Sequence, residues 1–527
     1  MDKRFACGVL LLSLLGCSSK GSGSTSGGSG GNANPTGGAG NPTGGAGGGG
    51  AGTGGAPATQ SASVLQRNKN LSRDGHFIDA KFTKAAAAKT TFDATFMATF
   101  GGSMWASPLY VENGPGGRGV FIAVTTMNNV FALDETSGAV VWMRNVGPPA
   151  MLNGPNAPCG SIHPLGILAT PVIDGATRTI YVSAAVGNAT TILRQEVHAL
   201  SVDDGAEKPG WPVDVAAKLG WDPQPHNPRS ALSLVNGIVY IAYGGHVMDC
   251  GEYHGRVVAI DSKDPTKVAG WATGGIGEAI WAPGGMPSDG TAVFASTGNR
   301  TRGGNGAHQD SEEVVRISGM ATMNRDTDLY FPAAWKAMDD SDADFGSSSP
   351  IVIDVPGATP STMVVAPAKT GHLYFLDAKK LGGMGGELFD LNAGSGGFTA
   401  PAGYPTTKGI FVALTLSSVR CPMGMSGQIG GILVKPGAPA QPEVVWCAPA
   451  QGRYSPIATT VDGKNEAVVW FMNGSKLNAV DGETGQMVFN GGDGSCEGVI
   501  RWTSPIAVKG RIVVGSATRL CSWSVGQ

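Results

Sequence analysis

The feature that most constrains the fold is a short unit of strands and turns that recurs along the chain. Its clearest copy, Val120–Trp142, reads as three strands joined by two turns. Runs of β-branched, aromatic and aliphatic residues flank Asn128-Asn129, which suits a tight turn because asparagine tolerates a positive φ. In the second turn Asp134 can accept backbone hydrogen bonds, and Gly138 can adopt a left-handed conformation. A lone three-stranded meander is marginally stable, so the unit needs neighbours that cover its faces.

A second marker, a small residue usually followed by proline, precedes each copy of the unit. Proline fits at the first position of a strand, where no hydrogen-bond donor of the ladder is lost. Eight copies follow one another at intervals of 49 to 67 residues. They are Ser107-Pro108, Thr170-Pro171, Ser230-Ala231, Ala282-Pro283, Ser349-Pro350, Ala400-Pro401, Ser455-Pro456 and Ser504-Pro505.

The turn with aspartate and glycine also recurs, most clearly in Ala479–Phe489. A period of roughly 40–60 residues built from four short strands is typical of propeller blades. Two independent markers keep the same phase, which favours an all-β, eight-bladed propeller of four-stranded blades over an irregular pair of β-sandwiches. The last unit, Trp502–Trp523, supplies only three strands, so we expect Thr91–Phe100 to add the fourth and close the ring. A short helix is expected just before it, at Thr83–Lys89.

The first 17 residues have the pattern of a signal peptide. Lys3 and Arg4 precede a short apolar run that cannot span a bilayer. The run ends in Leu14-Leu15-Gly16-Cys17, which resembles the lipobox of bacterial lipoproteins and implies a lipid on Cys17; an ordinary signal peptide cut elsewhere is the alternative. Ser18-Ser19 follow without an aspartate, and the resemblance then implies the outer membrane, with the protein facing the periplasm or the cell exterior.

Residues 18–75 are predicted to form a disordered linker between this anchor and a propeller at residues 76–527. The linker is rich in glycine, serine and proline, and Asn34–Gly40 is repeated directly as Asn41–Gly47. Such a sequence cannot bury a core. We expect a flexible tether with an average reach of roughly 35 Å. The formal net charge of −3 gives no reason to expect a nucleic-acid partner, and we expect a monomer.

Six cysteines remain after Cys7 and Cys17 are assigned to the signal segment. An even number in an exported protein predicts disulfides, although six cysteines allow fifteen pairings. The phase of the repeat favours Cys421–Cys447 within the sixth blade and Cys496–Cys521 near the closure, which leaves Cys159–Cys250. A metal cluster at His246, Cys250 and His254, with Asp249 and Glu252, is the alternative for Cys250.

The repeats resemble those of the pyrroloquinoline-quinone (PQQ) propeller superfamily. Ala132–Trp142 is similar to the pattern Ala-Leu-Asp-x-x-Thr-Gly-x-x-x-Trp, with Ser137 at the relaxed position before Gly138. Other segments look like those of uncharacterised exported PQQ-like repeat proteins; they are Cys159–Ile167, His226–Arg229, Tyr253–Gly255 and Ser296–Asn299. The resemblance covers roughly Phe92–Trp523.

In the dehydrogenases of this superfamily, PQQ lies over a Ca²⁺ ion. The resemblance implies Asn299 as a cofactor-binding residue on the metal and Asp342 or Asp344 as the catalytic base. Two features depart from it: no Cys-Cys pair occurs, and Gly187–Thr191 has no carboxylate where a metal-binding glutamate is expected. A Ca²⁺ site would then lack charge and ligands.

Two functions follow from these patterns. The favoured one is a non-enzymatic, membrane-tethered lipoprotein whose propeller binds or scaffolds a protein, peptide or glycan, as the related repeats of an outer-membrane assembly lipoprotein do. The alternative is a PQQ- and Ca²⁺-dependent oxidoreductase acting on an alcohol or sugar. No nucleophile elbow, His-Glu-x-x-His motif or P-loop is present in the sequence.

Overall fold

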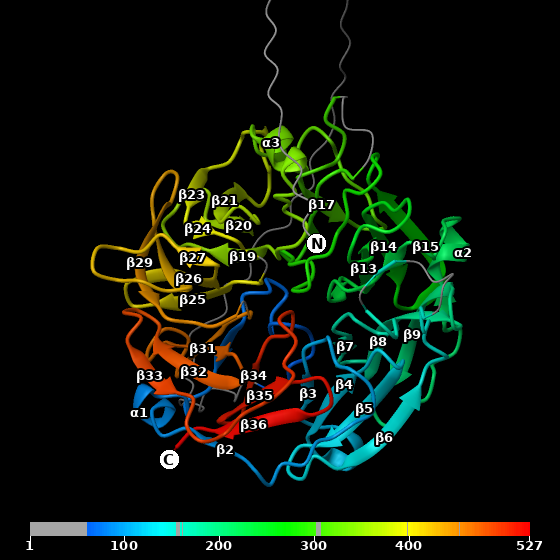
Figure 1. Ribbon diagram of the computed structural model, residues 1–527, viewed down its shortest axis with the longest axis horizontal. Coiled ribbons are helices and arrows are strands. Elements are labelled where there is room, and N and C mark those ends of the chain that lie inside the picture. Colours follow the sequence, from blue (N-terminus) through cyan, green and yellow to red (C-terminus); the bar gives the residue numbers. More distant parts are fainter. Residues whose placement is uncertain are drawn as a thin grey trace, which may run out of the picture. The chain divides into compact units, whose positions relative to one another are not determined.

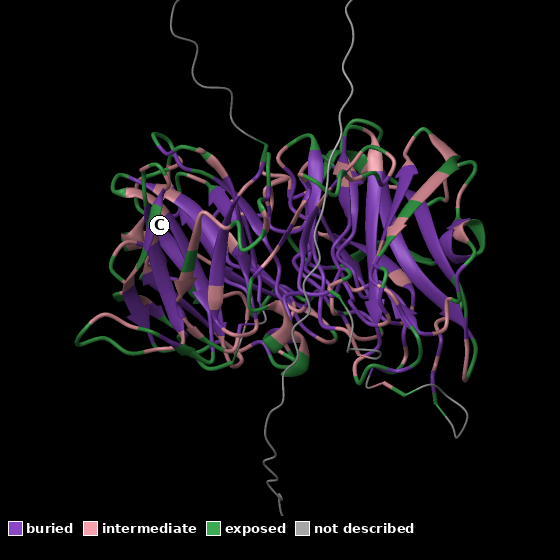
Figure 2. Cartoon of the chain, turned by 90° about the horizontal axis from the view of Figure 1, so that it is seen from above, coloured by how far each residue is buried: buried purple, intermediate pink, exposed green. Residues whose placement is uncertain are grey.

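The computed structural model describes residues 61–526 except 154–158, 161, 302–306, 398 and 453. In this part of the chain, eight sheets built mainly from antiparallel strands surround a central axis (Figure 1). Buried residues fill the strands, and exposed residues gather in the loops at the two faces (Figure 2). The predicted eight-bladed, all-β propeller is confirmed. The predicted signal peptide, Cys17 and residues 18–60 lie outside the described residues.

The first four blades each run from an inner strand at the axis to an outer strand at the rim. Blade 1 contains β3 (Leu109–Val111), β4 (Val120–Val124), β5 (Asn129–Asp134) and β6 (Val140–Asn145). Blade 2 contains β7 (Val172–Asp174), β8 (Thr179–Gly187), β9 (Ile192–Ser201) and β10 (Val213–Asp214). Blade 3 contains β12 (Ser233–Val235), β13 (Ile238–Gly245), β14 (Arg256–Asp261) and β15 (Asp264–Ala272), and β11 (His226–Asn227) pairs with β13. Blade 4 contains β16 (Ala292–Ser296), β17 (Val314–Ser318), β18 (Leu329–Phe331) and β22 (Gly383–Met384).

The other four blades follow the same order. Blade 5 contains β19 (Ile351–Asp354), β20 (Thr362–Pro367), β21 (His372–Asp377) and β23 (Phe389–Asn392). Blade 6 contains β25 (Ala402–Thr406), β26 (Gly409–Thr415), β28 (Ile429–Lys435) and β29 (Gln441–Ala448), and β24 (Gly394–Ser395) pairs with β27 (Ser418–Val419) beside it. Blade 7 contains β1 (His76–Ile78), β30 (Ile457–Thr460), β31 (Val468–Asn473), β32 (Lys476–Asp481) and β33 (Met487–Asn490). Blade 8 contains β34 (Ile506–Val508), β35 (Arg511–Gly515), β36 (Leu520–Ser524) and β2 (Thr91–Phe92).

Helices are few and short in the described part of the chain. They are α1 (Lys84–Ala87), α2 (Val215–Leu219), α3 (Trp335–Asp340) and the 3₁₀ turn η1 (Pro115–Gly117). The predicted helix at Thr83–Lys89 is confirmed by α1, where the Thr83 hydroxyl accepts a hydrogen bond from the Ala86 amide at 3.0 Å. None of these helices has the length and apolar character needed to cross a membrane.

The ring is closed by a strand from the beginning of the folded part. β2 pairs antiparallel with β36, with Thr91 opposite Ser524 and Phe92 opposite Trp523. The expected closing strand is therefore confirmed at Thr91–Phe92, but most of residues 93–100 are not strand. Asp93 explains the break, because its carboxylate accepts hydrogen bonds from the next amides and bends the chain away from the ladder.

The small residues of the markers lie at the axis of the ring. The Ser504 amide donates to the Ser107 hydroxyl at 2.8 Å, and the Ser107 amide donates to the Thr170 hydroxyl at 2.9 Å. The Ala400 amide donates in the same way to the Ser455 hydroxyl at 3.1 Å. These side chains are almost fully buried. Neighbouring blades meet so closely at the axis that only small residues fit, which explains why the marker recurs.

The glycine of the recurring turn also packs between blades. A Cβ atom on Gly205 would lie 2.8 Å from the Trp142 ring, and one on Gly485 would lie 2.8 Å from the Trp446 ring. The Trp142 and Trp446 indole N–H groups donate to carbonyls of these same turns, at 2.9 Å in each case. The tryptophan of one blade therefore caps the turn of the next.

Residues 61–79 form a segment that crosses the axis before the chain reaches blade 8; we call it the axial segment. Along this segment, backbone hydrogen bonds reach inner residues of successive blades, among them Tyr110, Ile173, Val352 and Ala458. Its residues 61–75 were predicted to belong to the disordered linker, and that boundary is wrong. The prediction failed because this segment is polar and has no hydrophobic periodicity; it is held by hydrogen bonds instead.

Candidate functional site

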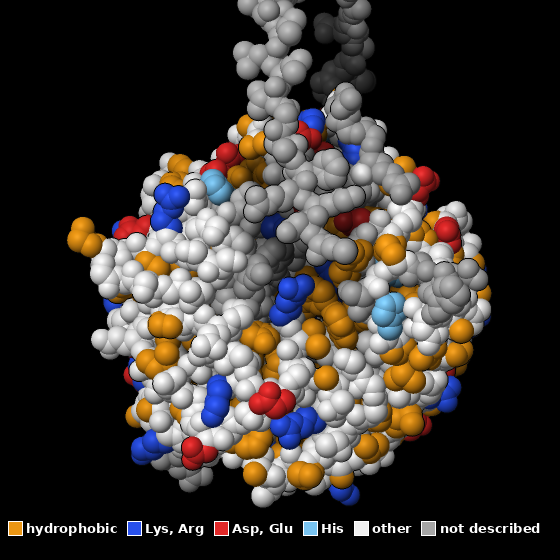
Figure 3. All heavy atoms as spheres, viewed as in Figure 1, with side chains coloured by type: hydrophobic (Ala, Val, Ile, Leu, Met, Phe, Trp, Pro, Cys, Tyr) orange, Lys and Arg blue, Asp and Glu red, His pale blue; other side chains and the backbone are white. Residues whose placement is uncertain are grey.

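A hollow of about 210 Å³ lies at the centre of one face of the ring. We call it the central pocket. Its walls come from connections between blades and from loops between the second and third strands, and antiparallel pairing places all of these loops on the same face. Basic and hydrophobic side chains gather around this centre (Figure 3). Its lining includes Arg229, Asp249, Trp281, Asp342, Asp344, Lys369, Arg501 and Trp502.

The axial segment lies beneath the central pocket. Arg67 donates from Nη1 to the Trp502 carbonyl at 2.6 Å, and Asn68 accepts from the Ser504 hydroxyl at 2.9 Å. Arg73 donates to the Arg67 carbonyl at 2.7 Å and to the Leu232 carbonyl at 2.6 Å. Burial lowers the pKa of each arginine to about 9, so both remain charged at neutral pH. Their hydrogen bonds compensate for this loss of solvent.

One wall of the pocket is acidic and is tied to a lysine. Lys369 pairs with Asp342 at 2.8 Å and with Asp344 at 3.3 Å. Asp344 is 1 % exposed and also accepts the Ser347 amide at 2.7 Å. Burial raises the pKa of Asp344, while Lys369 opposes that shift. Both predicted aspartates do line the pocket, but Asp344 is already occupied by these partners.

The opposite wall carries two arginines on a tryptophan. The guanidinium carbons of Arg229 and Arg501 lie 4.5 Å and 4.8 Å from the centre of the Trp502 ring. Arg229 also lies 5.7 Å from the centre of the Trp281 ring. Burial lowers the pKa of Arg229 to about 10, and nearby Asp344 counteracts this. Unlike the arginines of the axial segment, Arg229 forms no hydrogen bond or ion pair within the described part of the chain.

Four lining residues were not among the predicted site residues: Arg229, Trp281, Arg501 and Trp502. A signal was present, because each of these residues stands one to three positions before a marker. The marker fixes a small residue at the axis, so the residues immediately before it line the centre of that face. Asn299, in contrast, follows β16 and is not among the lining residues; its carbonyl accepts the Glu278 amide at 2.9 Å.

Comparisons with known proteins identify the fold. No family model matches the sequence, and no curated protein matches it. Among solved structures, quinohemoprotein alcohol dehydrogenase from Comamonas testosteroni is 13% identical, with a TM-score of 0.62 over 88% of this chain and 81% of that chain. The corresponding enzyme ADHIIG from Pseudomonas putida HK5 is 12% identical, with a TM-score of 0.60 over 88% and 80%. A europium-containing methanol dehydrogenase is 13% identical, with a TM-score of 0.54 over 86% and 90%.

The fold is that of the quinoprotein dehydrogenase propellers. At these identities the similarity establishes the fold alone, so the residues themselves must show whether PQQ and Ca²⁺ fit. Asn299 is not among the residues that line the pocket, and Asp342 and Asp344 are both paired with Lys369. In the described ranges, no three or more His, Cys, Asp or Glu side chains are grouped to hold a metal ion. The residues present do not fit the PQQ and Ca²⁺ pair.

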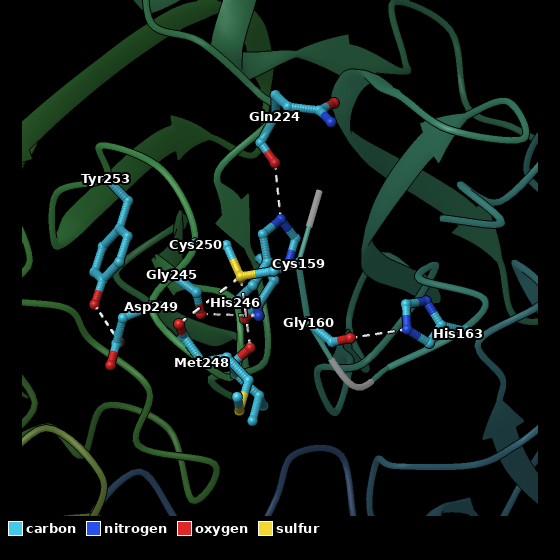
Figure 4. The surroundings of a disulfide bond; sticks show 12 residues. Cys159, Gly160, His163, Gln224, Gly245, His246, Met248, Asp249, Cys250 and Tyr253 are labelled. Carbon is cyan, nitrogen blue, oxygen red and sulfur yellow. Dashed lines mark hydrogen bonds between the residues drawn. A yellow bond between two sulfur atoms is a disulfide. The ribbon is translucent and has the colours of Figure 1, made fainter. Parts of the chain in front are cut away.

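All three predicted disulfides are confirmed, with Cα–Cα distances of 5.5 Å for Cys159–Cys250, 5.8 Å for Cys421–Cys447 and 5.9 Å for Cys496–Cys521. Cys159–Cys250 lies beside the pocket loop at His246–Asp249 (Figure 4). The alternative metal cluster is wrong. Cys250 is bonded to Cys159, the His246 ring pairs with the Gln224 carbonyl at 2.8 Å, and the His254 ring pairs with the Thr273 carbonyl at 3.0 Å.

Blade 4 holds a group of buried acids that the sequence did not reveal. Glu312 and Glu313 are both 0 % exposed. Glu312 accepts the Phe345 amide at 2.9 Å, whereas neither carboxyl oxygen of Glu313 has a hydrogen-bond partner among the described residues. Burial raises the pKa of Glu313 to about 9, with Asp310 adding to the shift. Glu313 therefore keeps its proton at neutral pH and avoids a buried charge.

Proposed function

We propose that the chain is a lipoprotein, anchored to the outer membrane through Cys17, whose propeller binds glycans in its central pocket. Protein, peptide and glycan were the expected ligand classes. A hollow of about 210 Å³ is smaller than the sites that hold drug-sized ligands, roughly 300–1,000 Å³. It accepts one sugar ring at the end of a chain and is too small to bury a protein surface.

The observation that carries this proposal is the pairing of aromatic faces with opposite charges around one small hollow. Trp502 is partly exposed and contacts Arg229, Arg501 and Trp105, and the C–H face of a sugar ring can pack against what remains open of this aromatic surface. The exposed Asp342 offers acceptors for hydroxyl groups, and the arginines offer donors. A few placed polar groups in an otherwise apolar hollow give orientation and specificity.

The course of the axial segment fits a tethered binding protein. The Glu112 amide, in the turn after the inner strand β3, donates to the Ser63 hydroxyl at 3.0 Å. That turn lies at the face opposite the central pocket, because one strand separates it from the connection into blade 1. The described chain thus begins at the face opposite the central pocket.

A glycan array tests the binding function. The full chain, purified in detergent, is applied with an Asp342→Asn variant and an Arg118→Gln variant. Arg118 lies in the turn between β3 and β4, at the face opposite the pocket, and is exposed. We expect a defined set of glycans to bind, weakened at least fivefold by Asp342→Asn and unchanged by Arg118→Gln. Equal binding by all three proteins, or no bound glycan, would contradict the proposal.

The anchor is tested separately. Cells that express the full chain are labelled with a radioactive fatty acid, and Cys17→Ser is compared with the unchanged protein. We expect label on the unchanged protein and none on the variant, together with loss of the variant from the outer-membrane fraction. Label retained by Cys17→Ser, or an unlabelled native protein, would contradict lipid attachment at this residue.

A further inference from the structure

We propose that the central pocket selects acidic sugars, whose carboxylate binds between Arg229 and Arg501 beside Trp502. The inference rests on the proposed glycan-binding function and assigns the chemical class of the ligand. Uronic acids are the simplest members of this class. The reasons lie in the unequal way in which the charges of the pocket are compensated.

Arg229 is held in the pocket without a partner for its charge. Its Nε atom is buried and has no hydrogen-bond partner among the described residues. Its guanidinium group contacts two tryptophan rings instead, at 4.5 Å and 5.7 Å from their centres. Arg229 is only partly buried, so its remaining N–H groups are open to a ligand, and a carboxylate can accept two of them.

Arg501 adds a second cation at the mouth of the pocket. It is exposed, and it makes a cation–π contact with Trp502 but no ion pair within the described ranges. Arg229 and Arg501 contact the same Trp502 ring, so the two cations lie close enough to repel each other. An anion between them would remove this repulsion.

The other charged groups of the pocket already have partners. Lys369 is paired with both Asp342 and Asp344, and Asp249 accepts the Tyr253 hydroxyl at 2.5 Å. The lining carries three Lys or Arg and three Asp side chains, and the two cations without an ion-pair partner within the described residues, Arg229 and Arg501, lie on the tryptophan side. The carboxylates on the opposite wall still have free acceptor capacity for hydroxyl groups. A ring that bears one carboxylate and several hydroxyl groups satisfies both walls.

A free peptide carboxylate would also pair with the arginines, but the pocket favours a sugar. The partly exposed Trp502 gives a sugar ring an aromatic surface that a peptide backbone does not require. A peptide is more often held by main-chain hydrogen bonds along an open strand edge. The peptide is therefore an outcome to be tested.

Isothermal titration of the full chain in detergent tests the inference. The probes are D-glucuronate, D-glucose, glucuronamide and triglycine, and the variants are Arg501→Gln and Arg229→Gln, with Arg118→Gln as the matched control. We expect glucuronate to bind about tenfold or more tightly than glucose and glucuronamide, as one charge-assisted pair predicts. Each pocket variant should remove this preference, and Arg118→Gln should keep it. Circular dichroism checks that the variants are folded. If Arg229→Gln does not fold, Arg501→Gln, at an exposed position, decides whether the preference for glucuronate depends on the arginines.

The other outcomes separate this inference from the proposed function. Equal affinity for glucose and glucuronate would overturn the selection of acidic sugars but leave the proposed glycan binding intact. Tighter binding of triglycine than of glucuronate would overturn it in favour of a peptide terminus. A preference for glucuronate that survives both pocket substitutions would also overturn it, because the carboxylate would then bind elsewhere. Failure of every sugar, both in this titration and on the glycan array, would overturn both proposals.

Discussion

Two pairs of arginines lie close to the axis of this propeller and have opposite surroundings. Arg67 and Arg73, in the axial segment, are 1 % exposed and donate hydrogen bonds to carbonyl and hydroxyl groups of distant blades. Arg229 and Arg501 lie above them against Trp502 and have no ion-pair partner in the described part of the chain. The first pair holds the ring together, whereas the second pair is available to a ligand. The same residue type therefore serves structure or binding according to whether its donors are used within the fold.

The largest effect should come from the axial segment. Arg73→Ala removes a buried guanidinium that serves three acceptors, and it leaves the Leu232 and Arg67 carbonyls without this donor. We expect the free energy of unfolding to fall by about 3 kcal/mol, measured by urea denaturation. Arg73→Lys, the matched control, keeps the charge but loses the forked geometry of the guanidinium. Its free energy of unfolding should lie between those of Arg73→Ala and the unchanged protein. If Arg73→Ala lowers the free energy of unfolding by less than about 1 kcal/mol, the distinction between the structural pair of arginines and the pair in the pocket would be contradicted.

Glu313 shows a third arrangement, in which a buried ionisable side chain has no hydrogen bond among the described residues, lies 3.6 Å from His308 Nδ1 and is kept neutral. Its pKa, ordinarily 4.5, is about 9 in the folded protein, so folding retains a proton that the unfolded chain releases above pH 4.5. The contribution of Glu313 to the free energy of unfolding therefore falls as the pH rises from about 4.5 towards 9. Glu313→Gln should leave the free energy of unfolding at pH 4 nearly unchanged and raise it at pH 6 by roughly 2 kcal/mol in urea denaturation. The exposed Glu497→Gln should show no such difference; equal effects at both pH values would contradict a protonated Glu313.

Substitution of Arg229 in the pocket should hardly change the free energy of unfolding. Arg229→Gln loses a cation–π contact worth about 1 kcal/mol, but it also removes the cost of burying an unpaired cation. We expect the free energy of unfolding to stay within about 1 kcal/mol of the unchanged protein. The measurement is the same urea denaturation as for Arg73→Ala. A loss as large as that of Arg73→Ala would show that Arg229 is structural.

The smallest effect is expected when PQQ is added to the protein. Titration of the full chain with PQQ, with and without Ca²⁺, should show no saturable binding, because Asn299 does not line the pocket and Asp342 and Asp344 are paired with Lys369, so the described residues offer no Ca²⁺ site beneath the quinone. Oxidation of alcohols coupled to a dye should stay at the background level. Saturable binding that is lost in Asn299→Ala would contradict this interpretation and restore the oxidoreductase alternative.

The sequence was informative where structure is set locally. The turn residues Asn128, Asp134 and Gly138 and the eight markers predicted the blades, because each copy repeats the same backbone requirement. The central pocket could not be predicted in the same way. Arg229, Asp344 and Trp502 come from three connections that only ring closure brings together. The axial segment was not predicted to be part of the fold for another reason. Its buried Arg67 and Arg73 belong to a polar stretch whose sequence resembles a linker.

A crystal structure of the full chain soaked with D-glucuronate would test the central claim most directly. Density for the sugar should lie in the central pocket, with its carboxylate between Arg229 and Arg501 and its ring against a tryptophan. Density for the carboxylate at the Lys369 wall, or a sugar bound only outside this pocket, would contradict the assignment of the two arginines to the ligand.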